Sequence, residues 1–431
     1  MECSLRYSLR DEGGVERETG EAHARLETEQ LHINPEFGET VYVSYRDVVD
    51  ISEENYRLQL ALTSHETLVL FSLGYRYEDF RRALYQRRNE LMLNDLLITD
   101  RLQNSGVESH FVYVDEHHEA VQRGPCELRI YETSIVVLPE RGAIVRVPFS
   151  YISRIQTEDY ALVLHTDFGE QLTVSMLGRH FDPVKTALSN AIHELSLKTQ
   201  AYLHALSPAA TPAILRRVVR LMKDGKAAKR TDIDAISPAF WIALEQKLTT
   251  LGLQREYAFL LSLSQPSHSC IGVKRGLMGD LTGEYLWFLM PMYSLDPKTP
   301  GNAVALEAST DEGGGKATYF FRIVSRNAYG TYTDLDALHE AVDVCIQRIN
   351  RCMLAINFRR EPIYLSAERL DEPRYVKYKF AVQRLPSLRA LRQRFIGRIL
   401  HRSPEQWERD VRSLLAFNTR TQDDAVKWSK G

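Results

Sequence analysis

The 431-residue chain has no run that approaches the roughly 18 uninterrupted apolar residues of a membrane-spanning helix. Its first residues, Met1 to Arg6, also lack the basic-then-apolar profile of a secretion signal. Both absences predict a protein that neither spans a membrane nor is exported. The 44% of hydrophobic and 26% of charged residues are ordinary for a globular protein and exclude wholesale disorder.

Cysteine is scarce and scattered. The five cysteines are odd in number, and no two of them form a CxxC pair: Cys3, Cys126, Cys270, Cys345 and Cys352. Disulfide frameworks and thiolate zinc sites both need clustered spacing, so neither is predicted. Cys345 and Cys352 fall on one face of an expected helix, as small buried thiols do. This usage predicts a reducing compartment and therefore a cytoplasmic protein.

Lysine is absent from residues 1–120, which carry a net charge of −12. By contrast, residues 374–402 contain nine basic residues and no acidic one. The net charge of −3 for the whole chain hides this asymmetry. Opposite charge at the two ends predicts different partners for them.

The chain repeats itself at an offset of 104 residues without a gap. Between Gly20 and Leu91, 20 of 72 positions are identical to their counterparts in residues 124–195. Substituted pairs keep their chemistry, as Tyr45 and Phe149 do. So many ungapped identities indicate an internal duplication.

Each copy has the pattern of a small sheet that ends in a helix. Apolar residues alternate with polar ones, as at Leu31 and Ile33, and turn-prone residues separate about seven such runs. After Gly74 and Gly178 the period becomes helical. The apolar stripes of these two helices are Phe80, Leu84 and Leu91, and Val184, Leu188 and Leu195. Such a stripe needs an apolar surface to cover, and the open end of a bent sheet provides one.

Seven antiparallel strands with one C-terminal capping helix resemble the pleckstrin-homology (PH) superfamily, including its GRAM-like and bacterial PH-type members. The resemblance covers about residues 3–200 and rests on the order of the elements. In that family a phosphoinositide is held by clustered cations in the loop between the first two strands. The equivalent loops here, Asp11–Glu18 and Asp115–Glu119, are acidic, which disfavours a phosphoinositide at this place.

Tandem PH-like modules also resemble the middle domains of histone chaperones, whose acidic surfaces bind basic proteins. The resemblance therefore implies a protein or peptide partner, bound at a sheet edge or beside the capping helix. The acidic first module suits such a partner.

Beyond the repeat, the sequence predicts helices at 214–222 and 240–251 and then strands at 257–263, 269–274, 285–292, 303–308 and 317–324. A long helix is expected at about 334–355. The run Tyr285–Met290 has no polar alternation, which predicts a central strand covered on both faces.

The predicted fold class is thus α+β, with two tandem PH-like seven-stranded barrels, each with a C-terminal capping helix, then a helical segment and a third antiparallel sheet-plus-helix domain. The expected boundaries are 1–103 and 104–205 for the modules, 206–253 for the helical linker, 254–360 for the third domain and 361–431 for a basic helical region. A diverged third PH-like unit is an alternative for 254–360, although the offset of 104 does not continue into it.

Two basic segments, 216–230 and 374–402, are candidate binding surfaces. The first fits a helix-turn-helix that reads nucleic acid, but a solvated helix packed between domains is favoured. The second contains Leu388, Leu391, Phe395 and Ile399 at helical spacing, which suits nucleic acid or an anionic membrane. We favour instead a basic helix that docks on the third domain or pairs with the acidic first module. The candidate basic residues are Arg216, Arg217, Arg220, Lys223, Arg374, Lys377, Lys379, Arg389, Arg392 and Arg398.

No catalytic, cofactor-binding or metal-binding residue is predicted. The stretch Glu312–Lys316 lacks the leading glycine and the following Ser or Thr of a phosphate-binding P-loop, and a hairpin tip is expected instead. His117 and His118 favour a solvated loop over a metal site, because adjacent side chains point apart. His339-Glu340 lacks the second histidine of a zinc-protease helix. An enzyme in the third domain stays an open alternative without assignable residues.

Together these patterns predict a non-catalytic cytoplasmic scaffold without a cofactor, whose tandem modules recognise a protein partner. A nucleic-acid-associated protein and a protein attached peripherally to anionic membranes are the alternatives.

Overall fold

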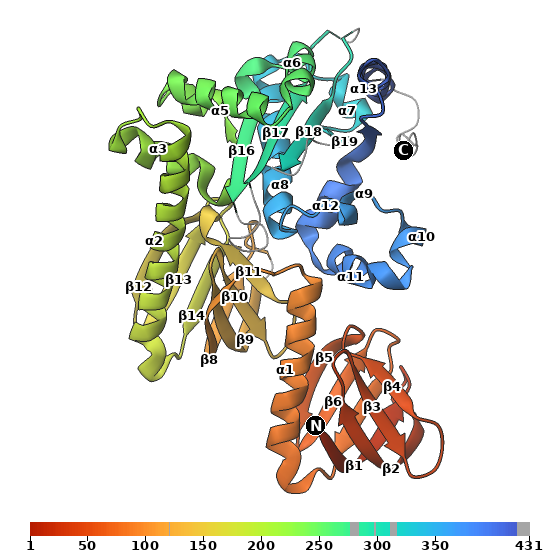
Figure 1. Ribbon diagram of the computed structural model, residues 1–431. Coiled ribbons are helices and arrows are strands. Elements are labelled where there is room, and N and C mark those ends of the chain that lie inside the picture. The colour runs from red at the N-terminus through yellow and green to blue at the C-terminus, as the bar shows by residue number, and fades with distance from the viewer. Residues whose placement is uncertain (120, 276–283, 297–298, 311–316, 420–431) are drawn as a thin grey trace. The chain divides into compact units, whose positions relative to one another are not determined.

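The computed structural model describes residues 1–119, 121–275, 284–296, 299–310 and 317–419. The chain divides into two compact units, Met1–Ala191 and Ile192–Gly431, here called the N-terminal and the C-terminal unit. The protein is α+β, as predicted (Figure 1).

The first module is a curled antiparallel sheet of seven strands followed by a helix. The strand order is β4-β3-β2-β1-β7-β6-β5, so the first strand pairs with the last one. The elements are β1 (Glu2–Arg10), β2 (Glu16–Leu26), β3 (Gln30–Pro35), β4 (Val41–Ser44), β5 (Val48–Glu54), β6 (Arg57–Leu62), β7 (Thr67–Phe71) and α1 (Tyr77–Asp95).

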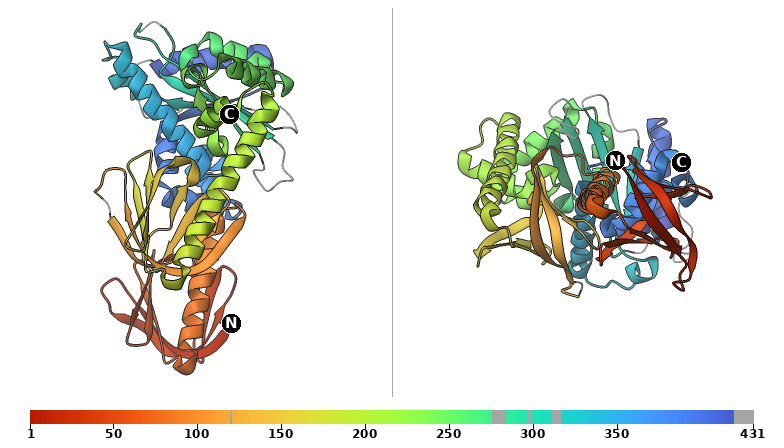
Figure 2. Two further views of the ribbon diagram at one scale, coloured as in Figure 1. Left: turned by 90° about the vertical axis from the view of Figure 1, so that its left-hand side faces the viewer. Right: turned by 90° about the horizontal axis from the view of Figure 1, so that it is seen from below.

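The second module has the same elements in the same order, β11-β10-β9-β8-β14-β13-β12. Figure 2 shows the strong curvature of both sheets. The elements are β8 (Leu102–Val114), β9 (Val121–Tyr131), β10 (Ser134–Pro139), β11 (Val145–Pro148), β12 (Ile152–Glu158), β13 (Ala161–Thr166), β14 (Gln171–Ser175) and α2 (Phe181–Leu206). From β3 to β7, every strand begins and ends 104 residues before its counterpart, which confirms that the duplication is structural.

The helix stripes predicted from the sequence cover the sheets. Phe80, Leu84 and Leu91 of α1 belong to one core with the inner faces of β1 to β7. Val184, Leu188 and Leu195 of α2 are also buried. Burial of each such side chain contributes about 1.5–3 kcal/mol, so the helix is an integral part of each module.

The C-terminal unit contains a six-stranded antiparallel sheet, sheet C, in the order β15-β16-β17-β18-β19-β20. Its strands are β15 (Ala228–Lys229), β16 (Cys270–Arg275), β17 (Glu284–Met292), β18 (Ala303–Thr310), β19 (Ala317–Arg322) and β20 (Phe395–Leu400). The predicted central strand is correct: β17 lies inside the sheet, and Leu286, Trp287 and Phe288 are fully buried.

Helices cover both faces of sheet C (Figures 1 and 2). On one face, Leu286, Phe288 and Met290 share a core with helices that precede the sheet and with the last helix. On the other face lies α8, whose apolar residues Leu338, Val342 and Ile349 are buried. The helices of this unit are α3 (Pro212–Met222), α4 (Arg230–Asp234), α5 (Pro238–Thr250), α6 (Gln254–Ser262), α7 (Arg326–Tyr329), α8 (Leu335–Ala355), α9 (Glu361–Tyr364), α10 (Ala367–Leu370), α11 (Val376–Arg384), α12 (Pro386–Arg394) and α13 (Pro404–Thr419).

Two expectations for this unit were wrong. The segment 257–263, expected as a strand, is mostly helix α6, because Tyr257 and Leu260 are the positions it buries, at helical spacing. A short apolar run is compatible with the period of a strand and with that of a helix, and here the tertiary packing favours the helix. The helical face expected across 388–399 breaks at Phe395, where the chain leaves α12 and pairs as β20 with β19. The free edge of β19 supplies hydrogen bonds that outweigh the local helical pattern.

Candidate functional site

Each module presents one tyrosine on the two-residue turn of a hairpin. The turn Asn55–Tyr56 joins β5 to β6, and Asp159–Tyr160 joins β12 to β13. Both residues of each turn have positive φ, 50° and 58° in the first module and 44° and 58° in the second. This is the geometry of a type I′ turn, which normally takes glycine at its second position.

The turn tyrosines are strained and exposed. A left-handed backbone costs a bulky residue about 1–2 kcal/mol, and Tyr56 and Tyr160 are 78% and 81% exposed. Each ring also packs edge-on against the first residue of the capping helix, with centroids 5.5 Å apart for Tyr77 and 5.8 Å for Phe181. An aromatic pair contributes about 0.5–1.5 kcal/mol, which roughly offsets the strain and leaves most of each ring free for another contact.

Hydrogen bonds to the carboxylate of Glu53 fix the residues next to the first turn. The Tyr77 hydroxyl donates to Glu53 Oε2 at 3.2 Å, and Arg81 Nε donates to Glu53 Oε1 at 2.6 Å. Burial and the Glu53 carboxylate raise the pKa of Tyr77 to about 12. The base of the Tyr56 turn is therefore a fixed platform rather than a loose loop.

The acidic residues between the first two strands of each module fold their loops. Asp11 accepts a hydrogen bond from the Val15 backbone N–H at 2.9 Å, which lowers the pKa of its carboxyl. At the equivalent position, Asp115 accepts from the backbone N–H groups of His117 and Glu119. Arg17 of the first loop is paired with Asp11 at 2.8 Å. His117 and His118 are exposed on a turn, as expected for a solvated loop.

The predicted basic residues of the first segment lie on α3 and just after it. Arg216, Arg217 and Arg220 are exposed, and none has a hydrogen-bonded or ion-paired side chain within the described part of the chain. Lys223 differs, because burial lowers the pKa of its ammonium group. The structure therefore groups the three arginines at the surface and sets Lys223 apart.

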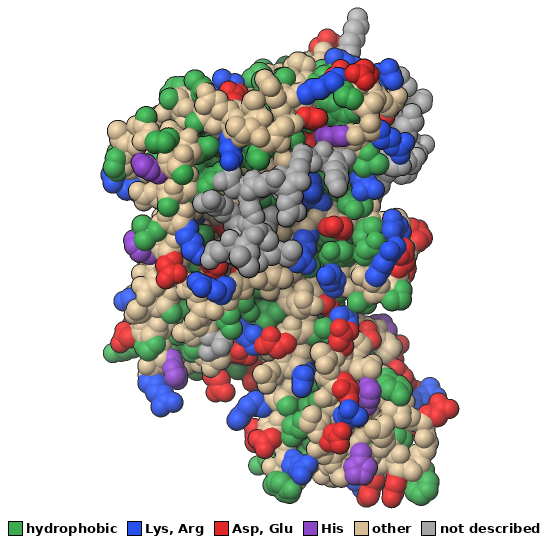
Figure 3. All heavy atoms as spheres, viewed as in Figure 1, with side chains coloured by type: hydrophobic (Ala, Val, Ile, Leu, Met, Phe, Trp, Pro, Cys, Tyr) green, Lys and Arg blue, Asp and Glu red, His purple; other side chains and the backbone are tan. Residues whose placement is uncertain are grey.

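The predicted basic residues of the second segment are spread over α11, α12, β20 and the turn before α11. Several are already used by the fold: Arg374 pairs with Glu372, Lys379 pairs with Asp371, and Arg392 donates to the carbonyls of Pro362, Ile363 and Leu365. Figure 3 shows basic, acidic and apolar or aromatic side chains side by side over α10 and α11. Lys377 lies 5.3 Å from the ring of Tyr378, Arg389 is exposed, and Arg398 lies over the ring of Tyr364.

A polar cluster lies within the apolar layer between sheet C and α13. Thr318 donates to Glu307 Oε2 at 2.6 Å and accepts from the Trp407 indole N–H at 2.9 Å. His401 Nε2 lies 3.1 Å from Glu307 Oε2, while its Nδ1 lies 3.7 Å from Glu256 Oε1. Glu307 and Thr318 are fully buried, so this cluster joins the sheet to α13 rather than facing a substrate.

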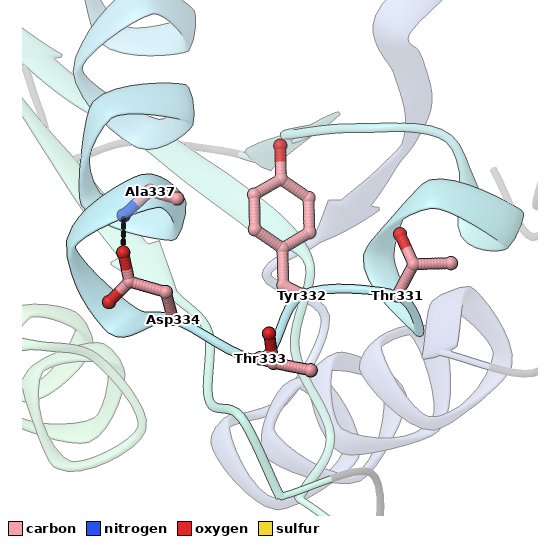
Figure 4. Close-up of a pocket in the computed structure, with 5 residues that line it drawn as sticks. All are labelled: Thr331, Tyr332, Thr333, Asp334 and Ala337. Atoms are coloured by element: carbon pink, nitrogen blue, oxygen red, sulfur yellow. Dashed lines mark hydrogen bonds between the residues drawn. The ribbon is translucent and has the colours of Figure 1, made fainter.

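A shallow hollow of about 230 Å³ lies before α8, lined by Thr331, Tyr332, Thr333, Asp334 and Ala337 (Figure 4). Asp334 is the N-cap of α8, and its carboxylate accepts from the backbone N–H groups of Asp336 and Ala337. The one carboxylate in this hollow is therefore engaged by the helix.

Within the described ranges, no group of three or more His, Cys, Asp or Glu side chains has a geometry that could hold a metal ion. The Glu312–Lys316 stretch lies outside the described residues, so its expected hairpin tip is not tested. Among the described helices, none combines the length and the apolar content required to cross a bilayer. No known family model and no curated protein matches the sequence.

Sequence reasoning did not single out the turn tyrosines as a site. The identity of Tyr56 and Tyr160 in the repeat was visible, but their exposure and positive φ were not. The available signal was a tyrosine that follows Asn or Asp between two alternating strands, where glycine is expected.

Proposed function

We propose that this chain is a non-catalytic binding protein whose tandem modules recognise a protein partner through the turn tyrosines. The resemblance to PH-like modules supports a binding role, because that architecture presents peptide- and protein-binding surfaces on sheet edges and beside the helix. The main observation in support is that both copies keep a strained, exposed tyrosine at the same turn. Tyrosine is enriched at the energetic centres of protein interfaces.

The retention matters because the copies have otherwise diverged. Exposed aromatic positions elsewhere were not kept: Phe37 corresponds to Arg141, and Tyr75 corresponds to Arg179. The contact with the capping helix offsets the backbone strain of each tyrosine, while most of each ring stays exposed for another contact. Two equivalent contacts on one chain also give a bivalent binder, whose avidity exceeds the affinity of either module.

The test compares capture of partners from the organism that encodes the chain. A Tyr56→Gly/Tyr160→Gly double variant removes both rings and relaxes both turns, so we expect its stability to change by about 1 kcal/mol or less. The matched control is Phe37→Ala, which removes an aromatic ring that is 89% exposed and is not repeated. We expect one set of partners with the natural chain and the control, and its loss with the double variant. Identical capture by all three, or no capture above background, contradicts the proposal.

We place the protein in a reducing compartment, the cytoplasm. This is supported by its five cysteines, all of which are buried and unpaired.

A nucleic-acid-associated function is the alternative, supported by the exposed arginines of α3, Arg216, Arg217 and Arg220. Binding through them should weaken steeply with salt as counterions are released. Undetectable or salt-independent binding to both DNA and RNA contradicts this alternative. Sedimentation with anionic and neutral vesicles tests peripheral membrane attachment in the same way.

A further inference from the structure

Two arginines and three tyrosines form a row of contacts on one face of sheet C. Arg398 Cζ lies 4.1 Å from the ring centroid of Tyr364, and the rings of Tyr364 and Tyr319 are 6.0 Å apart. Arg360 Cζ lies 5.3 Å from the ring of Tyr319 and 6.0 Å from that of Tyr285. We call these five residues the Arg–Tyr ladder.

Four parts of the chain build the ladder. Tyr285 lies at the start of β17, and Tyr319 on β19 is directly opposite Arg398 on β20. Arg360 follows α8 immediately before α9, and Tyr364 ends α9. The sheet therefore fixes three members, and the segment after α8 adds the other two.

The two guanidinium groups keep their hydrogen-bond donors free. Neither Arg360 nor Arg398 makes a side-chain hydrogen bond or an ion pair with any described residue; their contacts are with aromatic rings. By contrast, the guanidinium group of Arg392 donates hydrogen bonds to three backbone carbonyls. A ring covers the plane of a guanidinium but leaves its five N–H groups, which point outward in the plane, without an acceptor.

A buried hydroxyl without a partner lies beside these donors. Tyr285 is only 3% exposed, and its hydroxyl has no hydrogen-bond partner. The ring that carries it has its centroid 6.0 Å from the Arg360 Cζ. Buried hydroxyls are nearly always hydrogen-bonded, so one left open next to open cationic donors points to an absent acceptor.

The geometry points to a phosphate-binding site: we propose that the Arg–Tyr ladder binds the phosphate or diphosphate group of a small phosphorylated molecule. Arg360 and Arg398 offer in-plane N–H groups to its oxygens, and the Tyr285 hydroxyl donates one more hydrogen bond. Planar guanidinium forks match the oxygens of phosphate. Two carboxylates, Glu307 and Glu361, act on Arg360 electrostatically, but neither forms an ion pair with it.

The burial of the rings distinguishes a small ligand from a nucleic acid strand. Proteins that hold single strands stack bases on open aromatic faces. Here Tyr285 and Tyr319 are 3% and 6% exposed, and each has a face covered by Arg360. Bases have no platform on these two rings, while the guanidinium edges remain available to a phosphate.

The test titrates the full chain with pyrophosphate, adenosine 5′-diphosphate and adenosine by calorimetry. We expect both phosphorylated probes to bind and adenosine alone not to bind. Arg360→Gln and Arg398→Gln should each weaken binding about tenfold or more, because each removes charge-assisted hydrogen bonds. The matched control is Arg384→Gln, since Arg384 also lies over a ring, that of Phe380, but outside the ladder.

A second variant separates binding from folding. Tyr285→Phe removes only the hydroxyl that lacks a partner, so we expect a melting temperature equal to or above that of the natural chain and binding weakened about tenfold. No binding of either phosphorylated probe at about 5 mM overturns the proposal, since even weak sites of millimolar Kd are visible there. Equal weakening by Arg384→Gln, binding of oligonucleotides alone, or equal competition by citrate overturns it as well.

Discussion

At the scale of single residues, the contribution of the buried polar cluster around Thr318 to the free energy of unfolding can be measured. Thr318→Val keeps the shape of the side chain but removes a donor to Glu307 and an acceptor for Trp407. Two fully or nearly fully buried groups then lose a partner, and we expect unfolding free energy to fall by about 2–4 kcal/mol. Denaturant unfolding followed by tryptophan fluorescence measures it.

The control for this prediction is Thr249→Val, on the exposed side of α5. An exposed substitution away from such a cluster changes stability by about 0.5 kcal/mol or less. If both variants lose the same stability, the cluster has no special role in joining the sheet to α13.

His268 gives the C-terminal unit a pH dependence of known sign. Its ring lies 4.4 Å from that of His339, and burial, followed by repulsion from His339, lowers its pKa from the ordinary value of 6.5. The unfolded chain therefore takes up a proton at a higher pH than the folded chain does. Stability from the neutral ring is fully present above about pH 6.5 and is lost as pH falls toward the lowered folded-state value.

We expect His268→Gln to reduce the slope of unfolding free energy against pH in this window. His117→Gln, which alters an exposed loop histidine, is the control. Equal slopes for the natural chain and for His268→Gln contradict the prediction.

At the scale of elements, the turn that leads into each capping helix depends on one glycine. Gly178 has φ of +51°, and a Cβ added there would meet no atom within 4 Å, so only backbone strain opposes a side chain. We expect Gly178→Ala to destabilise the second module by about 1 kcal/mol. Faster amide hydrogen exchange of the strands in that module measures the effect.

Gly20→Ala is the matched control in the same unit. Gly20 lies on β2 without a positive φ, and its added Cβ would only touch Tyr7 at 3.7 Å. We expect little change in exchange there. A larger effect from Gly20→Ala than from Gly178→Ala contradicts the strain argument.

The elements also show what the sequence alone could establish. The repeat and its periodicity predicted both modules, because an element that buries one face shows its period in the sequence. Segment 257–263 was misassigned because a short apolar run fits two periods. Strand β20 was missed because its pairing with β19 joins residues more than 70 positions apart, a contact that no local pattern encodes.

The candidate sites were harder to predict than the elements. Tyr56 and Tyr160 were visible as a retained pair, but exposure and backbone strain belong to the folded chain. Arg398 was among the predicted basic residues, whereas Arg360 and Tyr285 were not. The ladder depends on four segments of the chain that meet only on the sheet.

At the scale of the whole molecule, the two compact units should unfold separately. All four tryptophans, including Trp241, Trp287 and Trp407, lie after residue 240 and therefore in the C-terminal unit. Each unit has its own core. We expect tryptophan fluorescence to report the C-terminal unit alone, so its denaturant midpoint should differ from that of far-ultraviolet circular dichroism. Coincident transitions contradict this expectation.

The five buried cysteines have a practical consequence. Each thiol has its pKa raised by burial, and the thiolate is the form that reacts with alkylating probes. We therefore expect the cysteines of the folded natural chain not to react with maleimides. One new cysteine in place of exposed Phe37 would carry a fluorophore or spin label alone, without first preparing a cysteine-free mutant.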